Sequence, residues 1–178
     1  MIGRRRSKQP MNHDSYPDRY ILSILQRVRT IAMVGASPNW KRPSNFAMKY
    51  LQEKGYRVIP VNPHAAAAGA EILGEKVCAS LSEISDDFGM VDIFRNSEAA
   101  GAITDEAIAL AEAKGIEVIW MQLGVRNDEA AERAEEAGLE VVMNRCPKIE
   151  WGRLNGELSW GGFNSGVICS RRRRLRAS

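Results

Sequence analysis

A chain of 178 residues is long enough to bury one substantial core and suits a single domain. Hydrophobic residues make up 44% of it, yet no apolar run approaches the roughly 20 residues that a membrane span requires. The first residues lack the apolar segment of a secretory signal. We therefore expect a cytoplasmic protein with no membrane partner.

The cysteines fit the same compartment. Cys78, Cys146 and Cys169 are far apart in the sequence and form no CxxC pair. An odd number of widely spaced cysteines is typical of reduced thiols and argues against a disulfide framework or a zinc site.

The basic residues gather at the two ends of the chain. Residues 1–10 hold four positive charges and residues 171–178 hold five, so that removing these nine from the formal +3 leaves −6 on residues 11–170. We expect basic tails at 1–16 and 171–178, flexible and solvated. The alternative is a salt-sensitive contact of these tails with a polyanion, but nucleic acid is not the partner we favour.

Between the tails, buried strands alternate with amphipathic helices. We expect helices over 17–28, 44–54, 98–114 and 128–137, strands over 30–34, 56–61, 90–94, 117–121 and 140–143, a looser alanine-rich stretch at 65–70 and a helical turn at 81–84. Phe46 should face the core, and Ser97 and Asn127 should cap helices. This alternation predicts an α/β fold, a doubly wound, mainly parallel sheet with helices on both faces.

The first strand leads into a helix through a loop of small residues. Gly35 permits a sharp turn and a close approach to a ligand, Ala36 is small, and the Ser37 hydroxyl can donate a hydrogen bond. Orphan N–H groups and the helix dipole favour an anion there, and Lys41 and Arg42 add positive charge. The loop thus predicts a phosphate site, although an ordinary structural turn is an equal alternative.

Loops at 35–45, 62–63, 94–97 and 122–127 should share one sheet edge, where such folds bind ligands. NAD is the first ligand to weigh. However, Ser37 replaces the expected second glycine, and the second strand ends at Asn62 and Pro63 rather than at an acid for a ribose diol. An NAD(P)-dependent oxidoreductase is therefore the second hypothesis.

Seven short motifs occur in the order seen in small CoA-binding domain proteins. They are VGASP (34–38), PSN (43–45), GYRVIPVNP (55–63), ILGE (72–75), VDIFR (91–95), WMQLGV (120–125) and NRCP (144–147). The chain is similar to this family and resembles the N-terminal CoA-binding domain of the succinyl-CoA synthetase α subunit.

The resemblance implies a Rossmann-like domain at 17–147 that binds coenzyme A or acyl-CoA. It implies that the first loop holds phosphate, that residues 62 and 63 flank the nucleotide, and that two further loops line the rest of the site. The candidate ligand-binding residues are Gly35, Ala36, Ser37, Pro38, Lys41, Arg42, Ser44, Asn45, Asn62, Pro63, Phe94, Arg95, Gln122 and Gly124. For Arg95, a structural ion pair is an equal alternative.

No catalytic residue can be assigned from the sequence. His64 has no nucleophile to pair with, and Asp92, a candidate buried acid, has no acidic partner. Cys146 is the one reactive candidate, with a buried inert thiol as the favoured alternative. Residues 148–170 carry aromatic residues among glycines, so we expect an irregular docked extension that also favours self-association.

Overall fold

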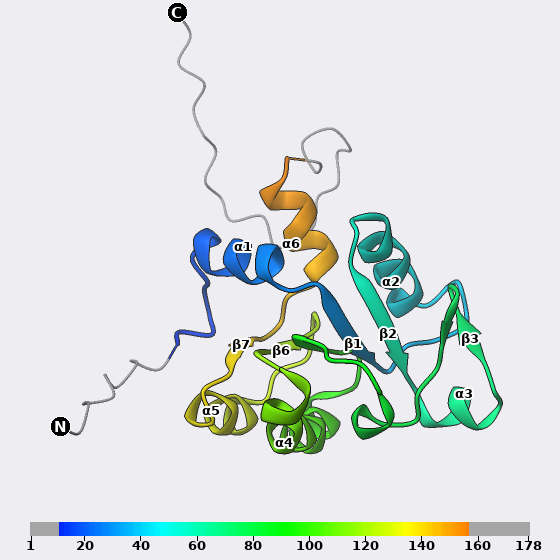
Figure 1. The fold of residues 1–178 in the computed structure, drawn as a ribbon. Helices are drawn as coiled ribbons and strands as arrows, with labels where there is room; N and C mark the ends of the chain where they lie inside the picture. The colour runs from blue at the N-terminus through cyan, green and yellow to red at the C-terminus, as the bar shows by residue number, and fades with distance from the viewer. Residues whose placement is uncertain (1–10, 157–178) are drawn as a thin grey trace, which may run out of the picture.

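The centre of the fold is a five-stranded parallel sheet (Figure 1). The computed structural model describes residues 11–156. Its strands are β1 (Thr30–Val34), β2 (Arg57–Val61), β5 (Met90–Ile93), β6 (Val118–Met121) and β7 (Glu140–Val142), arranged in the order β2-β1-β5-β6-β7. The chain therefore changes direction across the sheet between β1 and β5, and the predicted fold class is confirmed.

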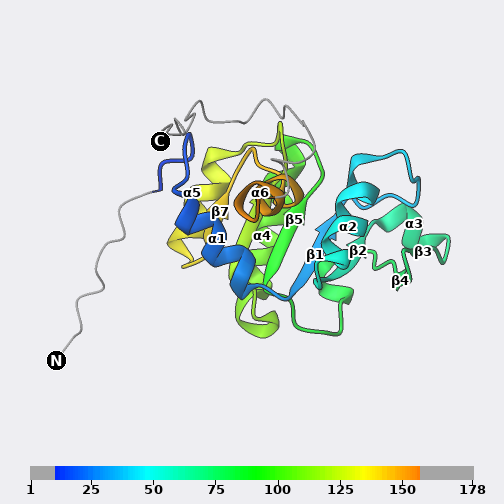
Figure 2. The same ribbon diagram turned by 90° about the horizontal axis from the view of Figure 1, so that it is seen from above.

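Helices cover both faces of this sheet (Figures 1 and 2). On one face lie α1 (Asp18–Arg27), α2 (Pro43–Glu53) and α6 (Pro147–Leu154), and on the other α4 (Ser97–Lys114) and α5 (Asp128–Glu136). Because side chains alternate along a strand, Ile31 and Met33 of β1 pack under the first set of helices, whereas Ala32 packs under the second. Two apolar layers result, and the strands are buried between them.

Smaller elements follow β2 at the edge of the sheet. A short helix, α3 (Pro63–Ala67), includes the first three residues of the stretch that was predicted to be loose at 65–70. The physical reason is local, because the Asn62 side chain accepts hydrogen bonds from the N–H groups of His64 and Ala65, and a proline begins the helix. A hairpin of β3 (Glu71–Ile72) and β4 (Glu75–Lys76) and the 3₁₀ turn η1 (Leu81–Glu83) complete this edge.

Three local expectations were wrong. Phe46 does not face the core but is 49% exposed, since it lies where α2 borders a cavity. Asn96, not Ser97, caps α4, because its side chain accepts from the N–H of Ala99. Residues 148–154, the start of the segment predicted to be an irregular docked extension, are not irregular but belong to α6 (Pro147–Leu154), whose Trp151 packs edge-on against Tyr50 of α2.

Residues 11–16, which the sequence analysis assigned to the N-terminal tail, contact the domain. The Tyr16 hydroxyl accepts from the N–H of Met143, and Asp14 forms an ion pair with Arg126 at 2.6 Å. The rest of the basic tails, at 1–10 and 171–178, and most of the predicted extension lie outside the described residues. Within 11–156, no helix combines the length and the apolar character needed to cross a bilayer.

Candidate functional site

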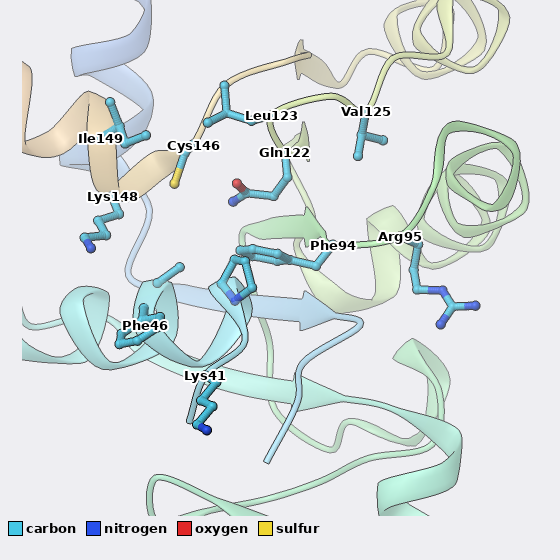
Figure 3. Close-up of a pocket in the computed structure, with 12 residues that line it drawn as sticks. Lys41, Phe46, Phe94, Arg95, Gln122, Leu123, Val125, Cys146, Lys148 and Ile149 are labelled. Carbon is cyan, nitrogen blue, oxygen red and sulfur yellow. The ribbon is translucent and has the colours of Figure 1, made fainter. Parts of the chain in front are cut away.

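A cavity of about 670 Å³ opens at the carboxyl edge of the sheet (Figure 3). Each of four strand-to-helix connections contributes to its lining: Lys41, Pro43 and Phe46 around the start of α2, Phe94 and Arg95 after β5, Gln122, Leu123 and Val125 after β6, and Cys146, Lys148 and Ile149 at the start of α6. It lies at the point where the strand order reverses, where doubly wound sheets bind ligands.

Gly35 brings the loops after β1 and β5 together. Its φ of +88° is in the left-handed region, which disfavours residues with a side chain. A Cβ atom added there would lie 2.8 Å from the Phe94 carbonyl oxygen and 3.1 Å from Cδ of Arg95. Glycine is therefore required here both by backbone conformation and by the close approach of a second loop.

Hydrogen bonds from polar side chains fix the loop after β1. The Ser37 N–H donates to Oγ of Ser44 at 3.1 Å, and Nδ2 of Asn45 donates back to the Ser37 carbonyl at 3.0 Å. Nδ2 of Asn62 donates to the Ala36 carbonyl at 2.8 Å, while its Oδ1 caps α3. The oxygen and the nitrogen of the Asn62 amide thus both bond within the fold. Ser44, Asn45 and Asn62 hold the loop in place through hydrogen bonds to the backbone of Ala36 and Ser37.

Two helices begin at the cavity without a side-chain cap. Both α2 and α6 start with a proline, Pro43 and Pro147, and no side chain within residues 11–156 hydrogen bonds to the N–H groups of their first turns. In contrast, α4 and α5 are capped by Asn96 and Asn127. The positive ends of the α2 and α6 dipoles are therefore left open toward the cavity, an arrangement that favours a bound anion.

The charged residues of the lining have one sign. Lys41, Arg95 and Lys148 line the cavity, and none of the described residues that line it is acidic. None of the three cations forms an ion pair with a residue in the described part of the chain; Lys41 lies over the Trp40 ring and Lys148 over the Tyr50 ring. Their charges are therefore available to an anionic ligand. The alternative that Arg95 forms a structural ion pair is not supported, because no acidic residue within 11–156 pairs with it.

A buried carboxyl group supports the Gln122 side chain. Asp92 of β5 is fully buried, as the sequence suggested, and Nε2 of Gln122 donates to its two oxygens at 2.9 and 3.1 Å. Burial raises the pKa of Asp92 to about 7, and the bond from Gln122 offsets part of this effect. The pair orients the Gln122 amide at the wall of the cavity.

Cys146 lies at the N-cap position of α6, at the wall that Lys148 and Ile149 also line. Only 8% of the residue is exposed, and burial raises the pKa of its thiol. The N–H groups of Lys148 and Ile149 are directed at the sulfur and lower this pKa, although neither reaches hydrogen-bond geometry. At neutral pH the Cys146 thiol is therefore protonated.

Residues 29–152 match the model of a family described as "CoA binding domain". The chain belongs to this CoA-binding domain family. This membership confirms the resemblance that was based on the seven motifs. The matched region includes all four connections that line the cavity.

Two relatives of this CoA-binding domain protein can be aligned with most of its length. The uncharacterised protein YneT of Bacillus subtilis (strain 168) is 37% identical over 129 residues, which are 72% of this chain and 90% of YneT. A hypothetical protein from Pyrococcus horikoshii OT3 has a solved structure that is 40% identical, with a TM-score of 0.73 over 85% of this chain and 99% of its own.

A larger protein shares the fold of this CoA-binding domain. The apo form of a dinucleotide-forming acetyl-coenzyme A synthetase 1 from Ca. Korarchaeum cryptofilum matches 65% of this chain with a TM-score of 0.53. The identity is 22%, and the match covers 26% of that chain, so the likeness shows a common fold only.

Some of the predicted site residues of the CoA-binding domain line the cavity, and others lie outside its lining. Lys41, Phe94, Arg95 and Gln122 line it. Outside the lining lie Gly35, Ala36, Ser37, Pro38, Arg42, Ser44, Asn45, Asn62, Pro63 and Gly124. Of these, Gly124 has a φ of +79° and donates its N–H to Oδ1 of Asn144, which joins the loops after β6 and β7.

Sequence reasoning missed most of the apolar lining of the cavity. The helical spacing of Phe46 predicts a core position, and Leu123 and Val125 lie beside Gln122 without a polar atom that would indicate a site. Lys148 and Ile149 directly follow the NRCP motif, which contains Cys146. This motif was the one sequence signal for a site at this wall.

Proposed function

We propose that this chain binds coenzyme A or an acyl-CoA in the cavity at the carboxyl edge of its sheet. The observation that carries the proposal is electrostatic: two uncapped helix N-termini and three cations without ion-pair partners among residues 11–156 surround a cavity with no acidic lining. Such a site favours a polyanion that also has an apolar part. Membership of the CoA-binding domain family supports this ligand over other anions.

The phosphate groups would lie at the loop after β1 and the start of α2. The Ser37 hydroxyl accepts from the N–H of Asn39, and its own proton has no acceptor among the described residues, so it can donate to a phosphate oxygen. Lys41 and Arg95 would supply the charge-assisted bonds. Arg42 is exposed outside the cavity lining, so we assign it at most the ribose phosphate, whereas Asn62 would keep the loop in shape.

The pantetheine arm would run along the apolar wall. Phe46, Phe94, Leu123 and Ile149 provide this surface, and Gln122 provides its uncharged polar side chain. A cavity of about 670 Å³ is of the size that usually holds one small organic ligand. Figure 3 shows Cys146 and Lys148 on the opposite side of the cavity from Arg95, so the arm would end near the thiol.

NAD would bind weakly at best. The strand next to β1, β2, is followed by Asn62, whose amide oxygen and nitrogen both bond within the fold. No carboxylate follows this strand at Asn62 or Pro63 to bind a ribose diol. We further propose that the chain binds its ligand without catalytic turnover, because the sequence offers no assignable acid–base pair. We also propose that it is cytoplasmic, because its three cysteines are odd in number and widely spaced, and that it self-associates through the aromatic residues of 148–170.

A thermal-shift measurement tests the proposed ligand. A ligand that binds only the folded state stabilises it by about 2.7 kcal/mol at 100 times its Kd, which for a chain of this size raises the Tm by roughly 5–10 °C. CoA should produce such a shift and NAD at the same concentration should produce little. A larger shift with NAD would contradict the assignment.

A further inference from the structure

The wall of the cavity opposite Arg95 carries a thiol, the one that the described residues contribute to the lining. Cys146 is at the start of α6, where two backbone N–H groups and the Lys148 ammonium favour negative charge on its sulfur, against the effects of burial and of the Asp92 carboxyl. The second cysteine within residues 11–156, Cys78, lies outside this cavity. The thiol is thus placed where a ligand, rather than another cysteine of the described chain, reaches it.

Gln122 offers a ligand a second polar contact at this wall. Gln122 is only 5% exposed, and its Nε2 donates hydrogen bonds to Asp92. Its Oε1 has no hydrogen-bond partner in the described part of the chain. Figure 3 shows the end of the amide directed across the cavity toward Cys146. Among residues 11–156 no buried side-chain polar atom lacks a partner, so this oxygen is accessible from the cavity and is able to accept a hydrogen bond from a ligand. An amide N–H on the bound molecule would satisfy it.

We infer that Cys146 captures the thiol-bearing arm of the ligand covalently, as a mixed disulfide formed by exchange with the disulfide form of that ligand. The inference rests on the proposed function, since it requires a ligand whose arm carries amide groups and ends in sulfur. Amide N–H groups of the arm pair with Gln122, and its terminal sulfur lies against Cys146.

The exchange is balanced without any further reactant. The Cys146 thiolate attacks one sulfur of the ligand disulfide, so that a bond forms between Sγ and this sulfur while the original S–S bond breaks. The second half leaves as a thiolate and takes up a proton, equivalent to the one that Cys146 released to solvent. The oxidising equivalent comes from the ligand disulfide, and a free thiol reverses the step.

Ionisation of Cys146 sets the pace of this exchange. Burial and the Asp92 carboxyl raise the pKa of its thiol, and the N–H groups of Lys148 and Ile149 together with the Lys148 ammonium lower it. The experiment is therefore run at about pH 8.5, near the ordinary pKa of a cysteine.

The test treats the full chain with CoA disulfide and follows the mass of the intact protein. A bound reagent presents its sulfur at a millimolar effective concentration, so about 0.1 mM CoA disulfide should label the chain about tenfold faster than the same concentration of glutathione disulfide. We expect one CoA per chain, removed by dithiothreitol. Acetyl-CoA, whose sulfur is blocked, should slow the labelling by competition.

Variants assign the adduct to one sulfur. Cys146→Ser should lose the fast labelling, whereas Cys78→Ser/Cys169→Ser, which leaves Cys146 as the sole cysteine, should keep it. Equal labelling of Cys146→Ser and the parent chain, or equal rates with the two disulfides, would overturn the inference.

A calorimetric titration of Cys146→Ser with CoA separates the two proposals. If this variant binds CoA while the parent chain forms no adduct, covalent capture is wrong and reversible binding stands. If neither the variant nor the parent binds CoA, the proposed function itself fails, and the inference fails with it.

Discussion

Gly35→Ala tests whether the close contact between the loops after β1 and β5 serves ligand binding. Gly55 is a matched control, because its φ of +91° is nearly the same as the +88° of Gly35 but an added Cβ there meets nothing within 4 Å. Both substitutions place alanine in the left-handed region, at a cost of about 1–2 kcal/mol. At Gly35 the new methyl group would also lie 2.8 Å from the Phe94 carbonyl oxygen.

The difference between the two variants isolates this contact. Because the loops must separate to admit the methyl group, we expect Gly35→Ala to lower the free energy of unfolding by about 1–3 kcal/mol more than Gly55→Ala. The Arg95 side chain passes within 3.1 Å of the same position, so it must move as well. Loss of its bond to phosphate would cost about 1.5–3 kcal/mol, about ten- to a hundredfold in CoA affinity.

Urea denaturation gives the free energies of unfolding, and a CoA titration of the folded variants gives the affinities. Gly55→Ala should bind CoA like the parent chain. The reasoning is refuted if the two variants lose the same stability, or if folded Gly35→Ala binds CoA as tightly as the parent.

Two further variants test the charges around the site. Since burial raises the pKa of Asp92 to about 7, the folded chain keeps a proton that the unfolded chain releases above about pH 4, and the free energy of unfolding falls as pH rises between these values. Asp92→Asn keeps an acceptor for Gln122 but has no proton to release, so its stability relative to the parent chain should rise between about pH 4 and about pH 7, as measured by urea denaturation. A pH-independent difference would contradict the buried carboxyl. Lys41→Ala should weaken CoA binding about ten- to a hundredfold in a titration, whereas Lys49→Ala, an equal charge change on an exposed residue of α2 outside the cavity, should not; equal effects would mean that only the overall charge matters.

The order of strands and helices followed from the sequence because local signals and burial agree along most of the chain. Asn127 caps α5 as predicted, and Gly115 ends α4 in the left-handed conformation that favours glycine. In the strands, apolar residues are buried on both faces, so their hydrophobic runs marked them clearly.

The cavity was less predictable because it depends on which apolar residues remain uncovered. Phe46 has the helical spacing of a core residue, and only the tertiary arrangement decides that its face of α2 borders open space. Asn62 illustrates the opposite case, a residue that was predicted to contact the ligand but holds the fold. Its position after a strand suggested ligand contact, but its amide bonds to Ala36 and to the start of α3. Sequence spacing cannot tell a residue that touches the ligand from one that holds the loop.

The central claim is that the cavity at the carboxyl edge of the sheet binds CoA. Calorimetric titration of the full-length chain with CoA tests it most directly, with dephospho-CoA and NAD as comparison ligands. We predict saturable binding of one CoA per chain, weaker binding of NAD, and loss of CoA affinity in Lys41→Ala but not in Lys49→Ala. A folded chain that releases no heat of binding with CoA, or that binds NAD more tightly than CoA, would contradict the account.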